Sequence, residues 1–181
     1  MGKVYEAIDD RLAEFLRAQQ VFFVATAPSA PDGHVNVSPK GLAGSFAVLD
    51  PRTVAYLDLT GSGAETVAHL RDSGRVCLMF CAFAGPPKIV RLHGRGEAIL
   101  PGDPRFPALA ESFSARPGVR SVVRVAVERV SDSCGFGVPL MAYQHDREQL
   151  PRWAQRKGEA ALAEYRREWN SASIDGLPAF E

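Results

Sequence analysis

The pattern with the clearest chemical meaning is a predicted strand that passes through two glycines into the first turn of a predicted helix. The segment, residues 56–66, reads YLDLTGSGAET, and Gly61 and Gly63 let the backbone approach a ligand closely. Amide groups at a helix N-terminus attract anions such as phosphate, and Ser62 and Thr66 add hydroxyl donors. A serine three residues before a glutamate is also the spacing of an ordinary capping box. Taken alone, the pattern leaves a phosphate site and plain helix capping both open.

A lysine at the end of a predicted strand is the second candidate. The segment NVSPKG, residues 36–41, alternates polar and apolar side chains until Pro39, which is expected to end the strand pairing. Lys40 then stands where the strand stops, with Gly41 behind it. A lysine ammonium is a compact positive charge that suits a phosphate or an electron-rich ring. A lone lysine is more often simply solvated, so both interpretations remain.

Basic side chains recur along a third segment, RLHGRGE. Arg91, His93 and Arg95 share one face of a predicted strand because strand side chains alternate with a period of two. A row on a solvated outer face would look the same, and no neighbour in the sequence equips His93 for acid–base catalysis. The chain lacks the spacings HExxH, paired CxxC, GxSxG and GxxxxGK[ST]. These absences argue against a metal site, a catalytic triad and a P-loop.

Charge and hydropathy exclude several classes of function. The 181 residues include 21 basic and 21 acidic side chains, so the formal net charge is zero, whereas a dedicated nucleic-acid protein normally has a basic excess. No window approaches the roughly 18 consecutive apolar residues of a membrane span. Acidic residues near the N-terminus do not suit a secretory signal. We therefore expect a cytoplasmic protein with no nucleic-acid or membrane partner.

The three cysteines, Cys77, Cys81 and Cys134, indicate reduced thiols, because an odd number without a secretory signal does not suggest a disulfide framework. Cys77 and Cys81 are four residues apart on a predicted strand. That spacing is about 13 Å, too far for a disulfide or a shared metal ion. We predict that both are small side chains of the core.

The order of predicted elements favours an antiparallel barrel. Helical spacing predicts a first helix over residues 5–20 and a second over 64–72, with a short helical stretch near 113. Strands are predicted at 21–27, 34–38, 46–49, 53–59, 75–83, 88–100 and 119–130. Short connections join them, without the crossover helices that a parallel sheet needs. The fold predicted is mainly β, a six- to seven-stranded antiparallel barrel that is closed or nearly closed.

The chain changes character near residue 146. Residues 1–145 are predicted to form the barrel domain, and residues 146–181 a C-terminal helix followed by an extended tail. An apolar stripe on that helix includes Trp153 and Trp169. The helix and tail must pack on the same barrel or on a partner subunit. Whether the two tryptophans contact a ligand or only anchor the helix is left open.

The pieces, taken in order, resemble a known family. VFFVATAP is followed by DGHVNVSPKG, YLDLTGSGAETVAHL, RVCLMFCAF and RLHGRGEAI, and the tail contains SIDGLP. Over residues 2–100 the chain resembles the FMN-binding split barrels related to pyridoxamine 5′-phosphate oxidase. The resemblance implies a Greek-key split barrel that works as a homodimer, with FMN held at the interface between the barrels.

The resemblance also implies where FMN would bind. Ser38, Pro39 and Lys40 would run along the isoalloxazine ring, and backbone groups of residues 56–58 would lie near the ring and the ribityl chain. The turn at 60–66 would hold the phosphate. The implied cofactor-binding residues are Ser38, Pro39, Lys40, Tyr56, Leu57, Asp58, Thr60, Gly61, Ser62, Gly63, Glu65 and Thr66.

Two departures from the family pattern bear on the substrate. Vitamin B6 oxidases of the family place an arginine and a lysine in the phosphate turn, where this chain has small residues and Glu65. Backbone amides, together with Arg71 or a basic residue of the partner subunit, would have to compensate. Those enzymes also hold pyridoxal phosphate with a C-terminal Arg–His segment, whereas this chain ends in SIDGLPAFE. We therefore expect a small-molecule substrate other than pyridoxamine phosphate.

The leading hypothesis is an FMN-dependent oxidoreductase, in which the flavin carries the electrons and the protein supplies position and charge. A deazaflavin-dependent reductase is an alternative, for which the Arg91–Arg95 row would bind the acidic tail of the cofactor. Another is a non-catalytic flavin or haem binder, with His93 or His69 as the haem ligand. The last is an interaction module without a cofactor.

Overall fold

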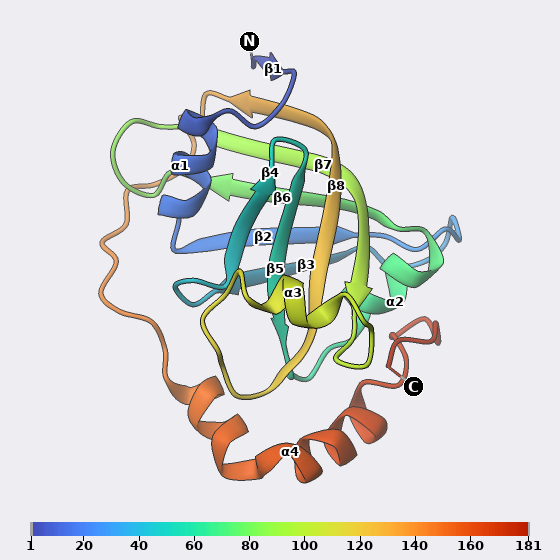
Figure 1. The fold of residues 1–181 in the computed structure, drawn as a ribbon. Helices are drawn as coiled ribbons and strands as arrows, with labels where there is room; N and C mark the ends of the chain where they lie inside the picture. Colours follow the sequence, from blue (N-terminus) through green and yellow to red (C-terminus); the bar gives the residue numbers. More distant parts are fainter. Residues whose placement is uncertain (1, 181) are drawn as a thin grey trace.

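The computed structural model describes residues 2–180, and its centre is one antiparallel sheet (Figure 1). The strands are β1 (Val4–Tyr5), β2 (Val21–Thr26), β3 (Asn36–Gly41), β4 (Phe46–Asp50), β5 (Thr53–Leu59), β6 (Arg75–Cys81), β7 (Ile89–Ile99) and β8 (Val119–Ser133). Their order in space is β3-β2-β6-β7-β8-β5-β4, and the short β1 pairs with β8. The predicted antiparallel split-barrel fold is confirmed. The strand β1 was not predicted.

The sheet is strongly curled and remains open at both ends of the strand order. In Figure 1, β2 and β6 run across the view, whereas β4 and β5 run steeply to them, and the long strands β7 and β8 bend between the two directions. β3 and β4 are edge strands, because each has one neighbour in the strand order. The curl gives the sheet a concave face, on which the apolar side chains gather.

The core fills this concave face. Phe22, Tyr56 and Phe80 are completely or almost completely buried, and the rings of Phe22 and Phe80 stack with centroids 5.0 Å apart. Alternation along the strands supplies the remaining aliphatic side chains. Leu12 and Leu16 of the first helix cover one end of the core. The alternating pattern in the sequence therefore sets which face is buried.

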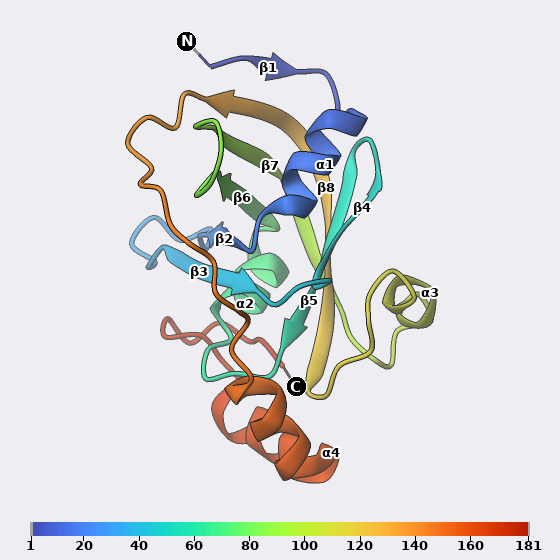
Figure 2. The ribbon, with the colours of Figure 1, turned by 90° about the vertical axis from the view of Figure 1, so that its left-hand side faces the viewer.

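Four helices flank the sheet (Figures 1 and 2). They are α1 (Asp10–Ala18), α2 (Glu65–Asp72), α3 (Phe106–Ala110) and α4 (Gln149–Trp169). The first helix begins five residues later than predicted, because the side chain of Asp9 accepts a hydrogen bond from the backbone N–H of Leu12 at 2.8 Å and so caps the helix. No helix within residues 2–180 combines the length and the apolar character needed to span a membrane.

The C-terminal helix is interrupted. Gly158 has φ 72° and ψ 164°, which a helix cannot accommodate, so the two halves of α4 do not share one continuous stripe. Ala154 and Leu162 are buried, whereas Trp169, predicted to lie on the apolar stripe, is exposed. Trp153 packs edge-to-face on Tyr165, with ring centroids 5.2 Å apart. The break therefore replaces the predicted stripe by an aromatic cluster on the helix itself.

Residues 134–148, called the linker from here on, connect β8 to α4. Figures 1 and 2 show the linker descending along one side of the sheet, past β2 and β3, to the start of α4. After α4 the chain turns back toward α2, where the carbonyl of Ala179 accepts a hydrogen bond from Arg71. Phe180 packs against α2 in a small second core. The tail thus packs on its own barrel.

Two predictions about β3 and β6 need correction. Pro39 does not end the pairing of β3, which continues with β2 through Lys40 to Gly41. Proline is tolerated there because β3 is an edge strand. Cys81 is buried, as predicted, but Cys77 is only partly buried, because the core lies on the opposite face of β6.

Candidate functional site

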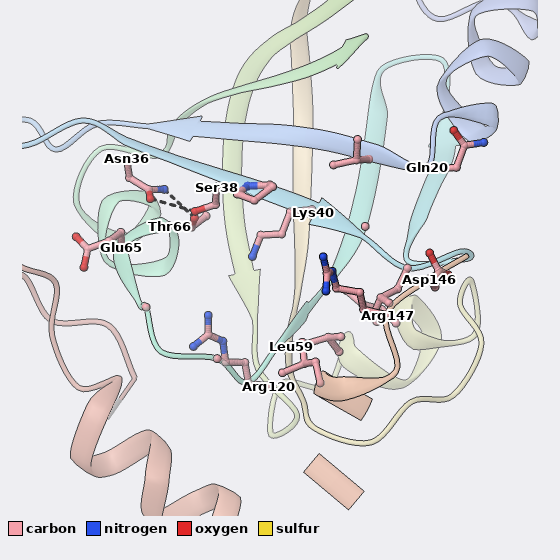
Figure 3. Close-up of a pocket in the computed structure, with 18 of the residues that line it drawn as sticks. Gln20, Asn36, Ser38, Lys40, Leu59, Glu65, Thr66, Arg120, Asp146 and Arg147 are labelled. Carbon is pink, nitrogen blue, oxygen red and sulfur yellow. Dashed lines mark hydrogen bonds between the residues drawn. The ribbon is translucent and has the colours of Figure 1, made fainter. Parts of the chain in front are cut away.

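A cavity of about 700 Å³ opens between β3, the end of β5, the start of α2 and the linker. Figure 3 shows its polar side chains arranged along β3, with Asn36 and Thr66 near α2 at one end and Asp146 and Arg147 at the other. The predicted residues that line it are Ser38, Pro39, Lys40, Leu57, Gly61, Gly63, Glu65 and Thr66. Two segments separated in the sequence therefore meet at one cavity.

The other four predicted residues do not line the cavity. Tyr56 is fully buried, and its ring lies edge-on to Phe22 at 5.5 Å between centroids. Thr60 is buried and donates a hydrogen bond to the carbonyl of Gly118, and Ser62 is exposed. Asp58 is buried behind the cavity wall and acts through its neighbours. The side chain of Tyr56 is therefore inaccessible, and a ligand would contact only its backbone atoms.

The buried hydroxyl of Tyr56 leads to a prediction about stability and ligand affinity. This hydroxyl has no hydrogen-bond partner among residues 2–180, and burial raises its pKa well above 10. Replacing Tyr56 by phenylalanine removes this hydroxyl and keeps the ring, so we expect the free energy of unfolding to stay the same or rise by up to about 1 kcal/mol. Ligand affinity should not change. Urea denaturation measures the first quantity, and a drop of more than about 1 kcal/mol would show that the hydroxyl is bonded.

A buried ion cluster forms the floor of the cavity. One oxygen of Asp58 lies 2.9 Å from Nζ of Lys40, and the other lies 2.7 Å from Nε of Arg120. The side chains of Asp58 and Arg120 are 1% and 5% exposed. Burial would raise the pKa of Asp58, but the two cations and their hydrogen bonds outweigh it and lower the pKa to about 2. Asp58 is therefore ionised and holds both cations in place.

A hydrogen-bonded chain of side chains lines the end of the cavity near α2. The amide nitrogen of Asn36 donates to the hydroxyls of Thr26 and Thr66 at 3.2 Å each, and Ser38 donates to the amide oxygen of Asn36 at 3.0 Å. Behind them, Nδ1 of the fully buried His69 lies 3.0 Å from the Thr26 hydroxyl. This chain ties β2 and β3 to α2, and it fixes the hydroxyls that face the cavity.

The capping box considered for the start of α2 is not formed. The helix is capped by Ala64, which makes no side-chain hydrogen bond, and Ser62 lies outside it. The Glu65 carboxylate instead accepts the backbone N–H of Ile174 from the tail, at 3.1 and 3.3 Å. Capping therefore does not account for the Gly61–Ser62–Gly63 turn.

The tail also supports the turn before α2. Asn170 is fully buried; its amide nitrogen donates to the carbonyl of Gly61 at 2.9 Å, and its oxygen accepts from Arg120 at 2.8 Å. Arg166 donates to the hydroxyl of Thr60 at 2.9 Å. Asp175 lies 2.7 Å from the imidazole of His34 on the loop before β3, and its carboxylate accepts the backbone N–H of that residue at 2.8 Å. The C-terminal segment thus fixes the position of the cavity wall.

Several residues singled out in the sequence lie elsewhere. His93 and Arg95 are exposed on the outer face of β7, and the partly buried Arg91 donates to Ser133. Arg71, expected to compensate a phosphate, donates to the carbonyl of Ala179 and lines a different cavity. His69 is sealed in the core. The residues on which the deazaflavin and haem alternatives rested therefore do not line this cavity.

Other lining residues were not predicted. They include Gln20, Val21, Asn36, Leu42, Leu59, Arg120, His145, Asp146, Arg147 and Leu150. Asn36 stands within the NVSPKG segment, so its position beside Ser38 was the available signal. Arg120 and the linker residues carry no local signal, because only the folded chain brings them to β3 and β5.

Comparison with known proteins finds one matching family model and a related protein. The family model described as pyridoxamine 5′-phosphate oxidase matches residues 8–134. The chain is similar to the pyridoxamine 5′-phosphate oxidase family protein ustO of Aspergillus flavus, with 42% identity over 96% of this chain and 76% of that protein.

Solved structures share the fold at lower identity. The HupZ protein of Group A Streptococcus has a TM-score of 0.53 and 22% identity, covering 68% of this chain and 91% of that one. A FAD-binding protein from Mesorhizobium loti has a TM-score of 0.52 and 20% identity, covering 73% and 96%. The family match and the 42% identity lead to one conclusion: the chain belongs to the pyridoxamine 5′-phosphate oxidase family.

Proposed function

We propose that this protein binds FMN in the cavity beside β3 and acts as an oxidoreductase on a small molecule other than pyridoxamine phosphate. The observation that carries the proposal is the meeting of the VSPKG and TGSGAET segments around the ion cluster of Asp58, Lys40 and Arg120. The cavity volume of about 700 Å³ lies within the roughly 300–1,000 Å³ range of small-molecule sites. Family membership makes FMN the first cofactor to test, as does the fold shared with a protein named as FAD-binding.

The donor groups of the cavity suit such a molecule. The turn with Gly61 and Gly63, together with the Thr66 hydroxyl at the start of α2, would hold the phosphate. Ser38, Pro39 and Lys40 would lie along the ring. The Glu65 carboxylate accepts the backbone N–H of Ile174, which holds it toward the tail. When bound, FMN supplies the transfer of electrons or hydride, and the protein residues position it and set the local charge.

We also propose that the protein forms a homodimer, and the edge strand β3 supports this proposal. Val35 and Val37 are 70% and 60% exposed on and just before β3, next to the cavity. Two exposed valines beside an unpaired strand edge form a surface that a second copy can cover. The cofactor would then lie at the interface of two barrels. We further propose that the protein acts in the cytoplasm.

The contacts of the tail support a different substrate. The tail reads SIDGLPAFE, and Asp175 within it binds His34 of its own chain. Phe180 is buried against α2 and the Arg120 guanidinium, which lies 4.8 Å from its ring centroid. Residues 171–180 are therefore committed to supporting the cavity wall, and their contacts leave them no role at a second phosphate.

The test is the visible spectrum of the purified 181-residue chain, followed by titration with FMN while flavin fluorescence is recorded. We expect saturable binding at one site per chain and quenched fluorescence. Riboflavin, which lacks the phosphate, should bind at least about tenfold more weakly if the turn at Gly61 holds that group. If FMN does not bind, the proposal is wrong, and the deazaflavin and haem titrations follow.

Lys40 provides a prediction about cofactor chemistry. With Asp58 and Arg120 it gives the cluster a net charge of +1, which becomes zero in Lys40→Met. A positive charge beside the ring stabilises the reduced, electron-rich flavin. Removing that charge in Lys40→Met should therefore lower the reduction potential of bound FMN, on the order of tens of millivolts. Spectroelectrochemical titration measures the change. Lys40→Arg should retain the potential, and an unchanged potential in Lys40→Met would remove Lys40 from this role.

A further inference from the structure

One cation at the cavity has no protein partner. Three lysine or arginine side chains of residues 2–180 line it, and two of them, Lys40 and Arg120, are bound to Asp58. The third, Arg147, makes no hydrogen bond or ion pair with any residue that the structure describes. A guanidinium lining a cavity with all its donors unused is a ready binding group for an anion.

The position of Arg147 is fixed by its neighbour. One carboxylate oxygen of Asp146 accepts the backbone N–H of Ala43 at 2.8 Å, and the other accepts the hydroxyl of Tyr143 at 2.9 Å. The first bond attaches the linker to the loop after β3, and the second lies within the linker. They also use both oxygens of Asp146, which makes no ion pair with Arg147 in the described part of the chain. The backbone around Arg147 is therefore held at the cavity, and its guanidinium has no direct ion-pair partner among residues 2–180.

The location of Arg147 separates it from the proposed phosphate end. Figure 3 shows Asn36, Glu65 and Thr66 at one end of the cavity, Ser38 and Lys40 along β3, and Arg147 with Asp146 at the other end. A cofactor whose phosphate lies at α2 and whose ring lies along β3 would leave Arg147 beyond the ring. A substrate that approaches the ring from this end of the cavity would meet Arg147.

We propose that Arg147 is the residue that binds the substrate, and that the substrate carries a carboxylate. This inference rests on the proposed function, because it takes the α2 end of the cavity as the cofactor phosphate site. A planar guanidinium can donate two parallel hydrogen bonds to a carboxylate, which fixes the orientation of the molecule as well as its affinity. Leu42, Leu59 and Leu150 give the nearby wall apolar surface for the remainder of a small organic acid.

The test measures binding of two matched probes, trans-cinnamate and its neutral amide, to the full chain with and without FMN. Isothermal titration calorimetry follows both forms, and the change in flavin absorption follows the FMN form. We expect the wild type with FMN to bind cinnamate at least about tenfold more tightly than the amide. Arg147→Gln should remove this preference, and Arg147→Lys should restore part of it. Arg156→Gln, an exposed arginine of α4 that lines none of the cavities described, is the matched control and should behave as the wild type.

The outcomes separate this inference from the proposed function. Equal affinity for acid and amide in the wild type, or an unchanged preference in Arg147→Gln, would overturn the role of Arg147 even when FMN binds normally. Loss of FMN affinity in Arg147→Gln would assign the arginine to the cofactor and also overturn the inference. If the wild type does not bind FMN, the proposed function fails; the calorimetric titration without FMN then still shows whether Arg147 selects a carboxylate.

Discussion

Replacing Asp58 by asparagine is expected to lower the free energy of unfolding by about 3–5 kcal/mol. The carboxylate is the single anion bound to both Lys40 and Arg120 in the described structure, and it is 1% exposed. Asparagine keeps the size of the side chain but removes its charge, so two cations lose their partner at a buried position. Urea denaturation followed by circular dichroism measures the loss. FMN affinity should fall as well, because Lys40 is no longer held.

The same carboxylate predicts a pH dependence. The pKa of Asp58 in the folded protein is about 2, below its ordinary value of 3.8, so protonation of the folded state requires more acid than protonation of the unfolded chain. Its contribution to stability is therefore fully present above about pH 3.8 and is lost as the pH falls toward 2. Between these values the stability of the wild type should fall more steeply than that of Asp58→Asn.

Asp103→Asn is the matched control for this prediction. Asp103 also binds an arginine, Arg105, at 2.8 Å, but both side chains are partly or largely exposed. Solvent screens such a pair, and its loss should cost less than about 1 kcal/mol. Equal effects of the two substitutions would show that the Asp58 cluster is as solvated as a surface pair, and the account of a buried cluster would be wrong.

Replacing Asn170 by alanine is expected to cost about 2–4 kcal/mol and to weaken FMN binding about tenfold. Its amide bonds both to Arg120 and to the carbonyl of Gly61, and alanine leaves both groups without this partner. The loss of the Gly61 contact frees the turn that would hold the phosphate. Denaturant unfolding and FMN titration of the same variant measure the two effects.

A neighbouring variant distinguishes this effect from a general sensitivity of the tail. Ser171 is exposed, and its hydroxyl makes no hydrogen bond within residues 2–180. Ser171→Ala should therefore leave both stability and FMN affinity unchanged. If Asn170→Ala keeps wild-type FMN affinity while it loses stability, the tail supports the fold but does not position the cavity.

The fold could be predicted because it depends on local patterns. Alternation identified strands such as β5, whose bounds agree at both ends, and short connections excluded a parallel sheet. The missed features depend on single residues. Asp9 moves the start of α1, and the left-handed conformation of Gly158 breaks α4, where the sequence pattern predicted one helix.

The site was predicted only in part, because a sequence pattern marks local features and not contacts between distant residues. Segments that carry glycines, a proline and a lysine attract notice locally, and several of their residues do line the cavity. Arg120 lies 62 residues from Asp58, and Asn170 lies 109 residues from Gly61. No local pattern marks such contacts, because they arise only when the sheet curls and the tail returns. Arg147 was missed because the sequence pattern assigned it to the C-terminal helix, which in the structure begins only at Gln149.

The cavity has two sides that are held in place differently, and the linker forms one of them. The barrel side is built from paired strands and a buried ion cluster, where a substitution disturbs folding. The linker side is an irregular segment fixed by a few bonds, such as those of Asp146 to Ala43 and of the Met141 N–H to the carbonyl of Phe83. Mutations there can alter ligand preference at little cost to the stability of the sheet. Ligand preference at this cavity can therefore change through one exposed segment while the side built from paired strands stays the same.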